Sequence, residues 1–209
     1  MGAESYLPEH VRGIAGLRSA AEHCEGCDLF RRATQTVFGE GKSRAASILV
    51  VGEQPGDMED RAGKPFVGPA GTVLDDALEL LGVDRASIYV TNAVKHFKWE
   101  PRGKARLHKN PSAREVAACR PWLMAEMQVV RPALVVCLGA TAARSLLGPS
   151  VKVTLQRGQV VAGPLGCPVL ITVHPASILR TKEQRDRHDA FNRFVGDLRP
   201  LLEYVGTGV

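Results

Sequence analysis

The residues with the clearest chemical potential lie in a basic loop at Trp99–Pro111, with the sequence WEPRGKARLHKNP. This loop contains one histidine, His108, and directly follows an apolar run typical of a strand end. A loop of this composition can bind a phosphate backbone while it presents an imidazole to a reactive carbon. Together with GEQPGDMED at 52–60 and HPASILR at 174–180, it indicates chemistry on a nucleobase in DNA. The alternative interpretation is a solvated, lysine-rich surface loop.

Positive charge is concentrated around this loop. The formal net charge of +5 is modest, but the only acid within residues 95–109 is Glu100. A local cluster of cations suits phosphate contacts better than a diffuse excess of charge does. The cations of this cluster are Lys95, Lys98, Arg102, Lys104, Arg106 and Lys109.

The length and composition are those of an ordinary globular protein. A chain of 209 residues can bury a full core, so we expect a single domain over 1–209. No apolar run approaches the roughly 18 residues that a transmembrane helix needs. The first residues also lack the basic-then-apolar pattern of a secretion signal. We therefore expect a cytoplasmic protein with no membrane partner.

Apolar runs and helical periodicity alternate along the chain. Buried strands are predicted at Ile48–Glu53, Ile88–Val94, Ala133–Leu138 and Pro168–Val173. Helices are predicted at Thr72–Leu81, from a Ser112/Glu115 capping box to about Val130, at 142–148, and at about Glu183–Tyr204. This alternation predicts a mostly parallel sheet, whose ligands bind outside the carboxyl ends of the strands. Four polar segments follow strands and should converge on that rim, namely GEQPGD, Asn92–His108, GAT and HPAS.

The segment GEQPGD reads as a tight turn from a strand into a loop. Gly52 and Gly56 allow a close approach of the backbone, so Glu53, Gln54 and Asp57 are expected to point into one cleft. Gln54 could pair with an amide edge, and Glu53 or Asp57 could act as a base or stabilise a cation. The alternative is an ordinary glycine turn with solvated acids.

Two further side chains suit the recognition of a flat base. Phe66 lies in a loop rich in Gly and Pro, where its ring could stack on a base or anchor the loop on the core. Asn92 follows a predicted strand and offers one acceptor and two donors, a set that matches N3–H and O4 of uracil. Asn92 could instead cap a turn.

Cys24 and Cys27 form a C-x-x-C pair, which indicates a metal or redox site in a cytosolic protein. A tetrahedral site needs two more ligands. Cys137 lies within an apolar run and is expected in the core. The remaining candidates are His96, just past a strand end, and Cys119, on the long predicted helix. The residues alone favour zinc.

In three of its motifs the chain resembles the uracil-DNA glycosylase superfamily, and within it the iron–sulfur branch called family 4. GEQPGDMEDRAGKPFVGPAG resembles the first motif of that branch, TNAVK at 91–95 its strand-end Asn motif, and HPASILR its terminal His-Pro-Ser motif. The similarity runs from about Cys24 to Leu198. It implies an α/β fold, a three-layer α/β/α sandwich with a central four-stranded parallel sheet.

Two departures from family 4 match its UdgX subgroup. His96 stands where family 4 has a cysteine ligand, and the chain carries an insertion with KARLH at 104–108, which resembles the K-R-R-I-H loop of that subgroup. UdgX proteins form a covalent bond between the loop histidine and the abasic sugar left after uracil excision. Ala105 replaces the usual arginine of this loop, Leu107 replaces isoleucine, and Ala176 replaces the first serine of the terminal motif.

The resemblance also assigns roles. It implies a [4Fe–4S] cluster whose ligands are Cys24, Cys27, His96 and Cys119, with the His ligand replacing a thiolate on iron. It implies that a flipped uracil stacks on Phe66, is read by Asn92, Gln54 and the backbone at Gly56 and Asp57, and leaves with its O2 facing His174. His108 would then attack C1′, with Glu53 relaying the imidazole proton or stabilising the sugar cation. Further contacts to the loop, phosphates and substrate are expected from Arg106, Ser177 and Arg180.

Two other functions remain open from the sequence. The first is a conventional hydrolytic glycosylase with multiple turnovers, in which His108 only contacts phosphate. The second is an iron–sulfur DNA-binding or redox-sensing protein without glycosylase activity, which would need neither Asn92 nor His174. For the favoured interpretation, a single-turnover enzyme, we expect uracil-containing DNA including single strands as the partner. Free uracil would be the product and the protein a monomer.

Overall fold

The computed structural model describes residues 2–10, 13–43 and 46–206. Its strands are β1 (Glu40–Gly41), β2 (Ile48–Gly52), β3 (Tyr89–Asn92), β4 (Trp99–Arg102), β5 (Ala105–His108), β6 (Leu134–Leu138), β7 (Val160–Ala162) and β8 (Pro168–Thr172). Its α-helices are α1 (Ile14–Ala21), α2 (Asp57–Ala62), α3 (Pro69–Leu80), α4 (Ala113–Val130), α5 (Ala140–Leu147), α6 (Val153–Gln156), α7 (Pro175–Leu179) and α8 (Gln184–Leu198). Short 3₁₀ turns lie at Ala3–Tyr6, Asp28–Arg31, Arg85–Ser87, Pro164–Gly166 and Arg199–Glu203.

The main sheet has the strand order β1-β3-β2-β6-β8-β7. Its four central strands are parallel, as the alternation of strands and helices predicts, and they are the four predicted apolar runs. The two edge strands, β1 and β7, pair antiparallel with β3 and β8 and were not predicted. They are two and three residues long, too short to leave a periodic signal in the sequence.

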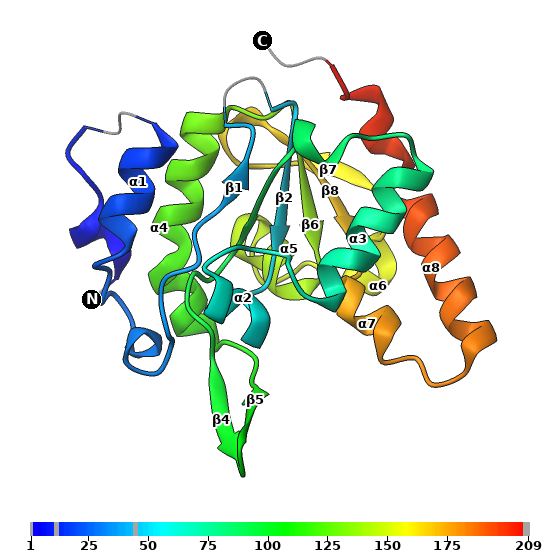
Figure 1. The fold of residues 1–209 in the computed structure, drawn as a ribbon. Coiled ribbons are helices and arrows are strands. Elements are labelled where there is room, and N and C mark those ends of the chain that lie inside the picture. The colour runs from blue at the N-terminus through cyan, green and yellow to red at the C-terminus, as the bar shows by residue number, and fades with distance from the viewer. Residues whose placement is uncertain (1, 11–12, 44–45, 207–209) are drawn as a thin grey trace.

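Helices cover both faces of this sheet, so the expected three-layer α/β/α architecture is confirmed (Figure 1). Alternate residues of each strand point to opposite faces. In β2, Leu49 and Val51 pack with α1, α4 and α5, whereas Ile48 and Val50 pack with α3, α7 and α8. Because both faces are buried, the central strands read as continuous apolar runs rather than as alternating patterns.

The segment predicted as a loop at Trp99–Pro111 is a β-hairpin. β4 and β5 pair antiparallel in a separate two-stranded sheet, with Trp99 opposite His108 and Arg102 opposite Ala105. Gly103 has a φ of 60° at the first of the two turn residues, where a type II′ turn requires glycine. The hairpin extends from the lower edge of the molecule in Figure 1 and carries His108 at its return end.

Helix ends follow local signals. The predicted capping box of Ser112 and Glu115 is present at the start of α4. α3 begins at Pro69, before the predicted Thr72, because proline is well suited to the first turn of a helix. The final helix ends at Leu198 and continues as a 3₁₀ turn to Glu203. Among the described residues, no helix has the length and apolarity to cross a membrane.

The carboxyl ends of β2, β3 and β8 lead into α2, the hairpin and α7, which lie at the same end of the molecule in Figure 1. Gly52 and Asn92, the last residues of β2 and β3, are register partners. The polar segments that follow these strands therefore meet at one rim, as the sequence indicated.

Candidate active site

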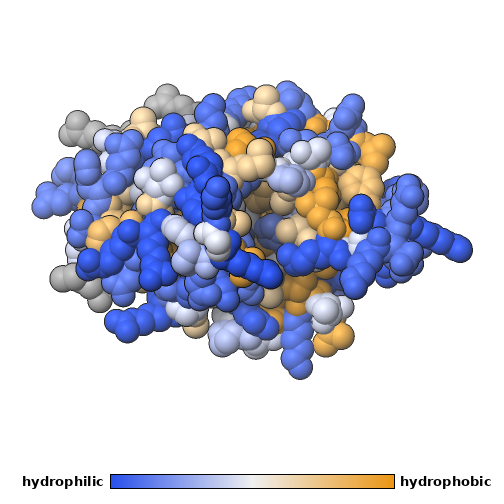
Figure 2. Space-filling view, turned by 60° about the horizontal axis from the view of Figure 1, so that its bottom comes forward, coloured by the Kyte–Doolittle hydropathy of each residue, from blue (hydrophilic) through white to orange (hydrophobic). Residues whose placement is uncertain are grey.

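A pocket of about 350 Å³ opens at this rim. Figure 2 turns this end of the molecule toward the reader and shows apolar side chains gathered beside a hollow, with hydrophilic side chains around them. The pocket brings together seven of the residues that the sequence singled out: Gln54, Gly56, Asp57, Phe66, Asn92, His108 and His174. It is also lined by Met58, Glu59, Pro69, Ala70, Ala176 and Leu179.

The floor of the pocket depends on the absence of a side chain at Gly52. A Cβ at this position would clash with Oδ1 of Asn92 and would lie 2.7 Å from Cζ of Phe66. Glycine therefore lets the Asn92 amide and the Phe66 ring approach each other across the end of β2. Phe66 is buried and has a φ of 57°, a left-handed conformation that is uncommon for a large side chain.

Glu59 is a pocket residue that the sequence analysis missed. Its carboxylate accepts hydrogen bonds from the backbone N–H groups of Gly56 at 3.0 Å and Gly68 at 2.7 Å. It thereby joins the loop before α2 to the loop that carries Phe66. The signal was present in the sequence, because a Glu three residues after the N-cap is the second half of a capping box.

His174 is held in one neutral tautomer. Its Nδ1 accepts a hydrogen bond from the backbone N–H of Ala176 at 3.2 Å, so in the neutral ring the proton lies on Nε2. Burial lowers the pKa of His174 to about 4, and the nearby charges of Arg180 and His108 contribute to this shift. The ring lies nearly parallel to Phe66, with centroids 6.5 Å apart. His174 is therefore a neutral hydrogen-bond donor.

Ser177 and Arg180 lie beside His174 in different ways. The Ser177 hydroxyl donates a hydrogen bond to the backbone oxygen of His174 at 2.7 Å, which fixes the first turn of α7. Arg180 is exposed at the end of α7, and its charge lowers the pKa of both His174 and His108. Ser177 shapes the rim, and Arg180 adds positive potential to it.

His108 lies at the mouth of the pocket with 45% of its side chain exposed. Its Nε2 is 2.9 Å from the Nε2 of Gln54 and 3.9 Å from Oε1 of Glu53. Because the Gln54 nitrogen is an amide donor, the imidazole Nε2 accepts and presents its lone pair on this side. Burial lowers the pKa of His108, Glu53 partly opposes this effect, and Arg180 adds to it.

Glu53 has a partner that the sequence analysis did not name. The hydroxyl of Thr141, at the start of α5, donates a hydrogen bond to Oε2 of Glu53 at 2.5 Å. Thr141 belongs to the GAT segment that was expected at this rim. The hydrogen bond fixes the carboxylate so that its other oxygen faces His108.

The amide of Gln54 is bonded to the hairpin segment. Its Oε1 accepts from the backbone N–H of Lys98 at 3.1 Å. The two hydrogens on its Nε2 serve His108 and the backbone oxygen of Lys109, both at 2.9 Å, and the backbone oxygen of Lys98 lies further away at 3.3 Å. These bonds fix which end of the amide faces His108. In this structure Gln54 therefore positions the histidine, in addition to lining the pocket where a base was expected to be read.

Arg106 fastens the hairpin to α2. Its guanidinium donates to the carboxylate of Asp57 and, at 2.6 Å, to the carboxylate of Asp60. It also donates to the hydroxyl of Thr34 at 3.0 Å. It packs over the rings of Phe97 and Trp99, each 5.4 Å from its central carbon. Only 12% of the Arg106 side chain is exposed. Of the two roles expected for Arg106, holding the loop is the one that these contacts serve.

If His108 attacks C1′ as the sequence predicts, replacement of Arg106 by alanine should slow that step by about 10- to 100-fold. His108 lies two residues away on the same strand, and a displacement of about 1 Å at a reacting group can cost 100-fold. Single-turnover rates on uracil-containing DNA measure the effect. The matched control is Arg102→Ala on β4, because the Arg102 side chain makes no hydrogen bond or ion pair with any described residue. Equal slowing in both variants would show that the loss of charge, rather than a change in hairpin position, causes the effect.

The basic cluster of residues 95–109 is largely paired within the protein. Lys98 is bonded to Glu115 and Lys109 to Glu100. Lys95 is only 1% exposed, so its inclusion among the surface cations was wrong. Lys95 lies just past the end of β3, and α4 covers it. The sequence did not show that its side chain is buried.

A buried ion pair lies behind Asn92. Nζ of Lys95 contacts Oε2 of Glu126 at 2.5 Å and donates to the backbone oxygen of Asn92 at 2.7 Å. The Glu126 carboxylate also accepts from the hydroxyls of Tyr89 and Thr91, both at 2.9 Å. This network ties the end of β3 to α4.

The candidate cofactor ligands lie on the N-terminal segment, after β3, and on α4. Burial raises the pKa of Cys27 and Cys119, and the charge of the nearby Cys24 adds to both shifts, so the three cysteines lie near one another. Sγ of Cys119 accepts from the backbone N–H of Lys95 at 3.3 Å, and His96 follows directly. Nε2 of His96 is 2.9 Å from the hydroxyl of Thr36, which itself donates to the backbone oxygen of Ala21. The hydroxyl therefore accepts from His96, whose Nδ1 lone pair is left for a ligand.

The candidate ligands are three thiols and one imidazole, ligand types that both zinc and iron–sulfur clusters accept. Among the described residues, no three His, Cys, Asp or Glu side chains converge as a site for one metal ion. The chemistry of the donor set therefore fits the expected cofactor.

The fold and this site define a three-layer α/β protein with a base-sized pocket, flanked by a neutral histidine donor and a histidine on a hairpin. The family model described as the uracil DNA glycosylase superfamily matches residues 38–199, and the chain belongs to this superfamily. The chain is 35% identical over 183 residues to the Type-4 uracil-DNA glycosylase of Thermotoga maritima, covering 87% of this chain and 90% of that protein. It is 33% identical over 172 residues to the Type-4 uracil-DNA glycosylase of Pyrobaculum aerophilum, covering 78% and 83%. A Type-5 uracil-DNA glycosylase of the same organism is 32% identical over 150 residues, covering 64% and 62%.

Proposed function

We propose that this protein excises uracil from DNA and captures the resulting abasic sugar on His108, as a single-turnover member of the UdgX type. Membership of the superfamily and the names of its relatives support the excision of uracil. The observation that carries the capture step is the position of His108, whose Nε2 lone pair lies at the mouth of the pocket. The substrate is uracil-containing DNA, including single strands, and the product is free uracil. The protein acts as a monomer.

Uracil enters the pocket as a flipped base. It stacks on Phe66, and the Asn92 amide pairs with its N3–H and O4 edge. The backbone near Gly56 and Asp57 closes the remaining side. A base with a different donor and acceptor pattern leaves these buried groups unpaired, and this mismatch is the basis of selectivity.

The glycosidic bond between C1′ and N1 of uracil breaks with its electron pair going to the base. Nε2–H of His174 donates to O2 of the departing uracilate, where negative charge develops. The sugar becomes an oxocarbenium cation, and the Glu53 carboxylate at the pocket mouth stabilises its positive charge. The Gln54 amide then releases its hydrogen bond to Nε2 of His108, and this nitrogen gives its lone pair to C1′ and forms a C–N bond. The imidazolium formed is neutralised when its Nδ1 proton passes to solvent.

We propose that Cys24, Cys27, His96 and Cys119 hold a [4Fe–4S] cluster. When bound, the cluster supplies a structural cross-link between the N-terminal segment and α4 rather than a group in the reaction. Cys119 accepts a hydrogen bond from Lys95, which in turn contacts Asn92, so the cluster would support the strand end that carries the reading amide.

The test is a gel with labelled single-stranded DNA that contains one uracil, mixed with the purified holoprotein and run hot in denaturing detergent. A shifted band that survives both treatments, at no more than one DNA per protein, is the expected result. Cleavage after alkali without a shifted band would mean ordinary hydrolysis and would overturn the capture step alone. Neither signal, with a loaded cluster, would overturn the assignment of uracil as the target base.

Capture is expected to be independent of pH in the neutral range and to fall on acidification. The reaction needs the unprotonated Nε2 of His108, and burial keeps the pKa of this ring below its usual 6.5. The rate is therefore full above that pKa and declines as the pH drops through it, while His174, with a pKa of about 4, stays neutral for longer. Single-turnover rates between about pH 8 and pH 4.5 measure the profile. A midpoint at or above 6.5 would contradict the buried environment of His108.

A further inference from the structure

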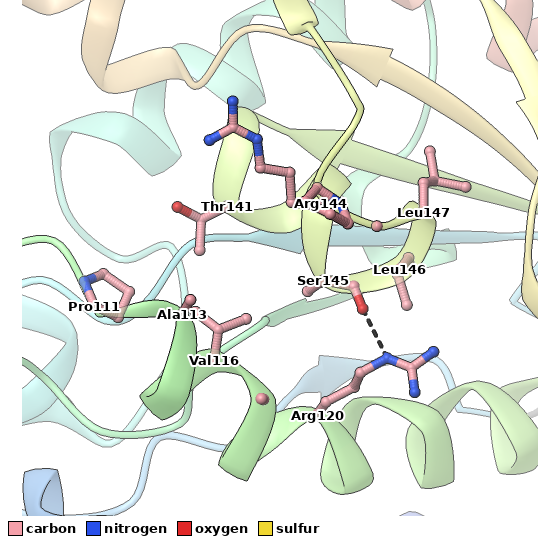
Figure 3. A pocket seen from close by; sticks show the side chains of 12 residues that line it. Pro111, Ala113, Val116, Arg120, Thr141, Arg144, Ser145, Leu146 and Leu147 are labelled. Atoms are coloured by element: carbon pink, nitrogen blue, oxygen red, sulfur yellow. Dashed lines mark hydrogen bonds between the residues drawn. The ribbon is translucent and has the colours of Figure 1, made fainter.

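A second hollow of about 710 Å³ lies between α4 and α5 and has no role in the mechanism above. Figure 3 shows the side chains of the two helices that face it. Its wall is mainly apolar, and its charged members are two arginines, Arg120 on α4 and Arg144 on α5. The apolar and small residues are Pro111, Ala113, Val116, Ala117, Leu146, Leu147 and Pro149.

Both arginines are exposed and are bonded through one nitrogen only. Nε of Arg120 donates to the backbone oxygen of Ser145 at 2.8 Å, as drawn in Figure 3, and Nε of Arg144 lies 3.4 Å from the backbone oxygen of Val151. Neither guanidinium forms an ion pair with a described carboxylate, in contrast to Arg106. Their terminal nitrogens are therefore held in place and remain free to bind an anion.

The hollow lies beside the candidate active site. Thr141 lines the hollow, and its hydroxyl is bonded to Glu53, whose other carboxylate oxygen faces His108. On the other side, Pro111 lies three residues after His108 at the base of the hairpin. The hollow therefore neighbours the pocket mouth on the side of Thr141 and Pro111, where a strand that leaves the pocket on that side would meet it.

We propose that the hollow binds the part of the same DNA strand that flanks the uridine on one side, an inference that rests on the proposed function. The phosphates bind the free guanidinium nitrogens of Arg120 and Arg144, and a neighbouring sugar and base cover the apolar wall. An apolar wall beside two unpaired cations suits an exposed nucleotide better than a phosphate alone. The site is independent of base identity, because it offers charge and contact area rather than base-edge donors.

The test measures the affinity for single strands that carry an excision-resistant 2′-fluoro-2′-deoxyuridine. These strands have full length or are truncated close to the uridine on the 5′ or the 3′ side. The first variant is Arg120→Gln/Arg144→Gln. The second is Arg144→Gln alone, which keeps the hydrogen bond from Arg120 to Ser145 and so controls for any loss of stability when that bond is removed. Arg185→Gln/Arg193→Gln on α8 removes two exposed arginines from the other layer of the protein as a control.

The double variant is expected to bind full-length DNA roughly 10-fold more weakly than the wild type. The slope of log affinity against log salt should fall by about 0.7 for each phosphate that the variant no longer neutralises. Truncation on one side should weaken the wild type but not the double variant. Arg120→Lys/Arg144→Lys should restore the salt slope.

Two outcomes would overturn the proposal. The first is equal sensitivity to truncation in the wild type and the double variant, and the second is equal weakening of DNA binding by the α8 control. Failure of the proposed function is recognised separately. In that case the wild type would neither release uracil from full-length DNA nor form a covalent complex with it.

Discussion

Replacement of His108 by serine is expected to abolish the denaturation-resistant DNA complex while uracil release continues. Serine removes the imidazole proposed to attack C1′ and leaves room at the pocket mouth for a water molecule, which completes an ordinary hydrolysis. The groups proposed to bind and expel uracil, Phe66, Asn92 and His174, are untouched. We expect the shifted band to weaken by at least about 100-fold, while alkali-labile sites accumulate over repeated turnovers.

The gel described for the wild type, followed by alkali treatment of a parallel sample, measures both products. His188→Ser is the matched control, because His188 is exposed on α8 and does not line the pocket. Persistence of the shifted band in His108→Ser would assign the nucleophile to another residue. Loss of uracil release as well as capture would show that His108 acts before the glycosidic bond breaks, contrary to the sequence of steps proposed.

Replacement of Glu126 by glutamine is expected to lower the free energy of unfolding by about 3–5 kcal/mol, the range found when one partner of a buried ion pair is removed. Lys95 is 1% exposed and Glu126 is fully buried, so the remaining ammonium would have no carboxylate and no water to replace it. Urea unfolding of the holoprotein measures the change. Glu79→Gln, on the exposed face of α3, is the control and should alter stability by less than about 0.5 kcal/mol.

The same substitution should also weaken binding of the excision-resistant strand. Lys95 donates to the backbone oxygen of Asn92, so a displaced ammonium shifts the strand end that reads uracil. The variant Lys95→Met/Glu126→Gln removes both charges and keeps an amide oxygen as acceptor for Tyr89 and Thr91, so it should recover much of the stability that Glu126→Gln alone removes. Stability that remains unchanged in Glu126→Gln would contradict the buried ion pair.

The sequence was sufficient for the parts of the fold that depend on short-range patterns. The central strands are continuous apolar runs because both of their faces are covered, and the capping box of α4 lies within four residues. The residues of the pocket were found for a related reason. They directly follow strands, and parallel strands bring their carboxyl ends to one edge.

The parts that escaped prediction depend on partners far apart in the chain. Gln54 is bonded to residues 44 and 55 positions away, and Arg106 to Asp60, 46 positions away. No local pattern shows such pairings, so the sequence did not indicate that Gln54 also positions His108 or that Lys95 is buried. The hairpin was read as a loop because its strands are short, polar and exposed, and lack an apolar alternation.

The hairpin shares no backbone hydrogen bond with the six-stranded sheet within the described part of the chain. Side chains of the main fold hold it instead. Gln54 binds the backbone at the end of the hairpin, and Asp57 and Asp60 bind the Arg106 side chain. Such an attachment makes the proposed nucleophile separable from the rest of the site. In the proposed reaction the groups that expel the base lie on the main fold, and the hairpin decides whether the sugar reacts with water or with His108. Grafting the hairpin together with Gln54, Asp57 and Asp60 should therefore transfer capture to a hydrolytic glycosylase of the same fold.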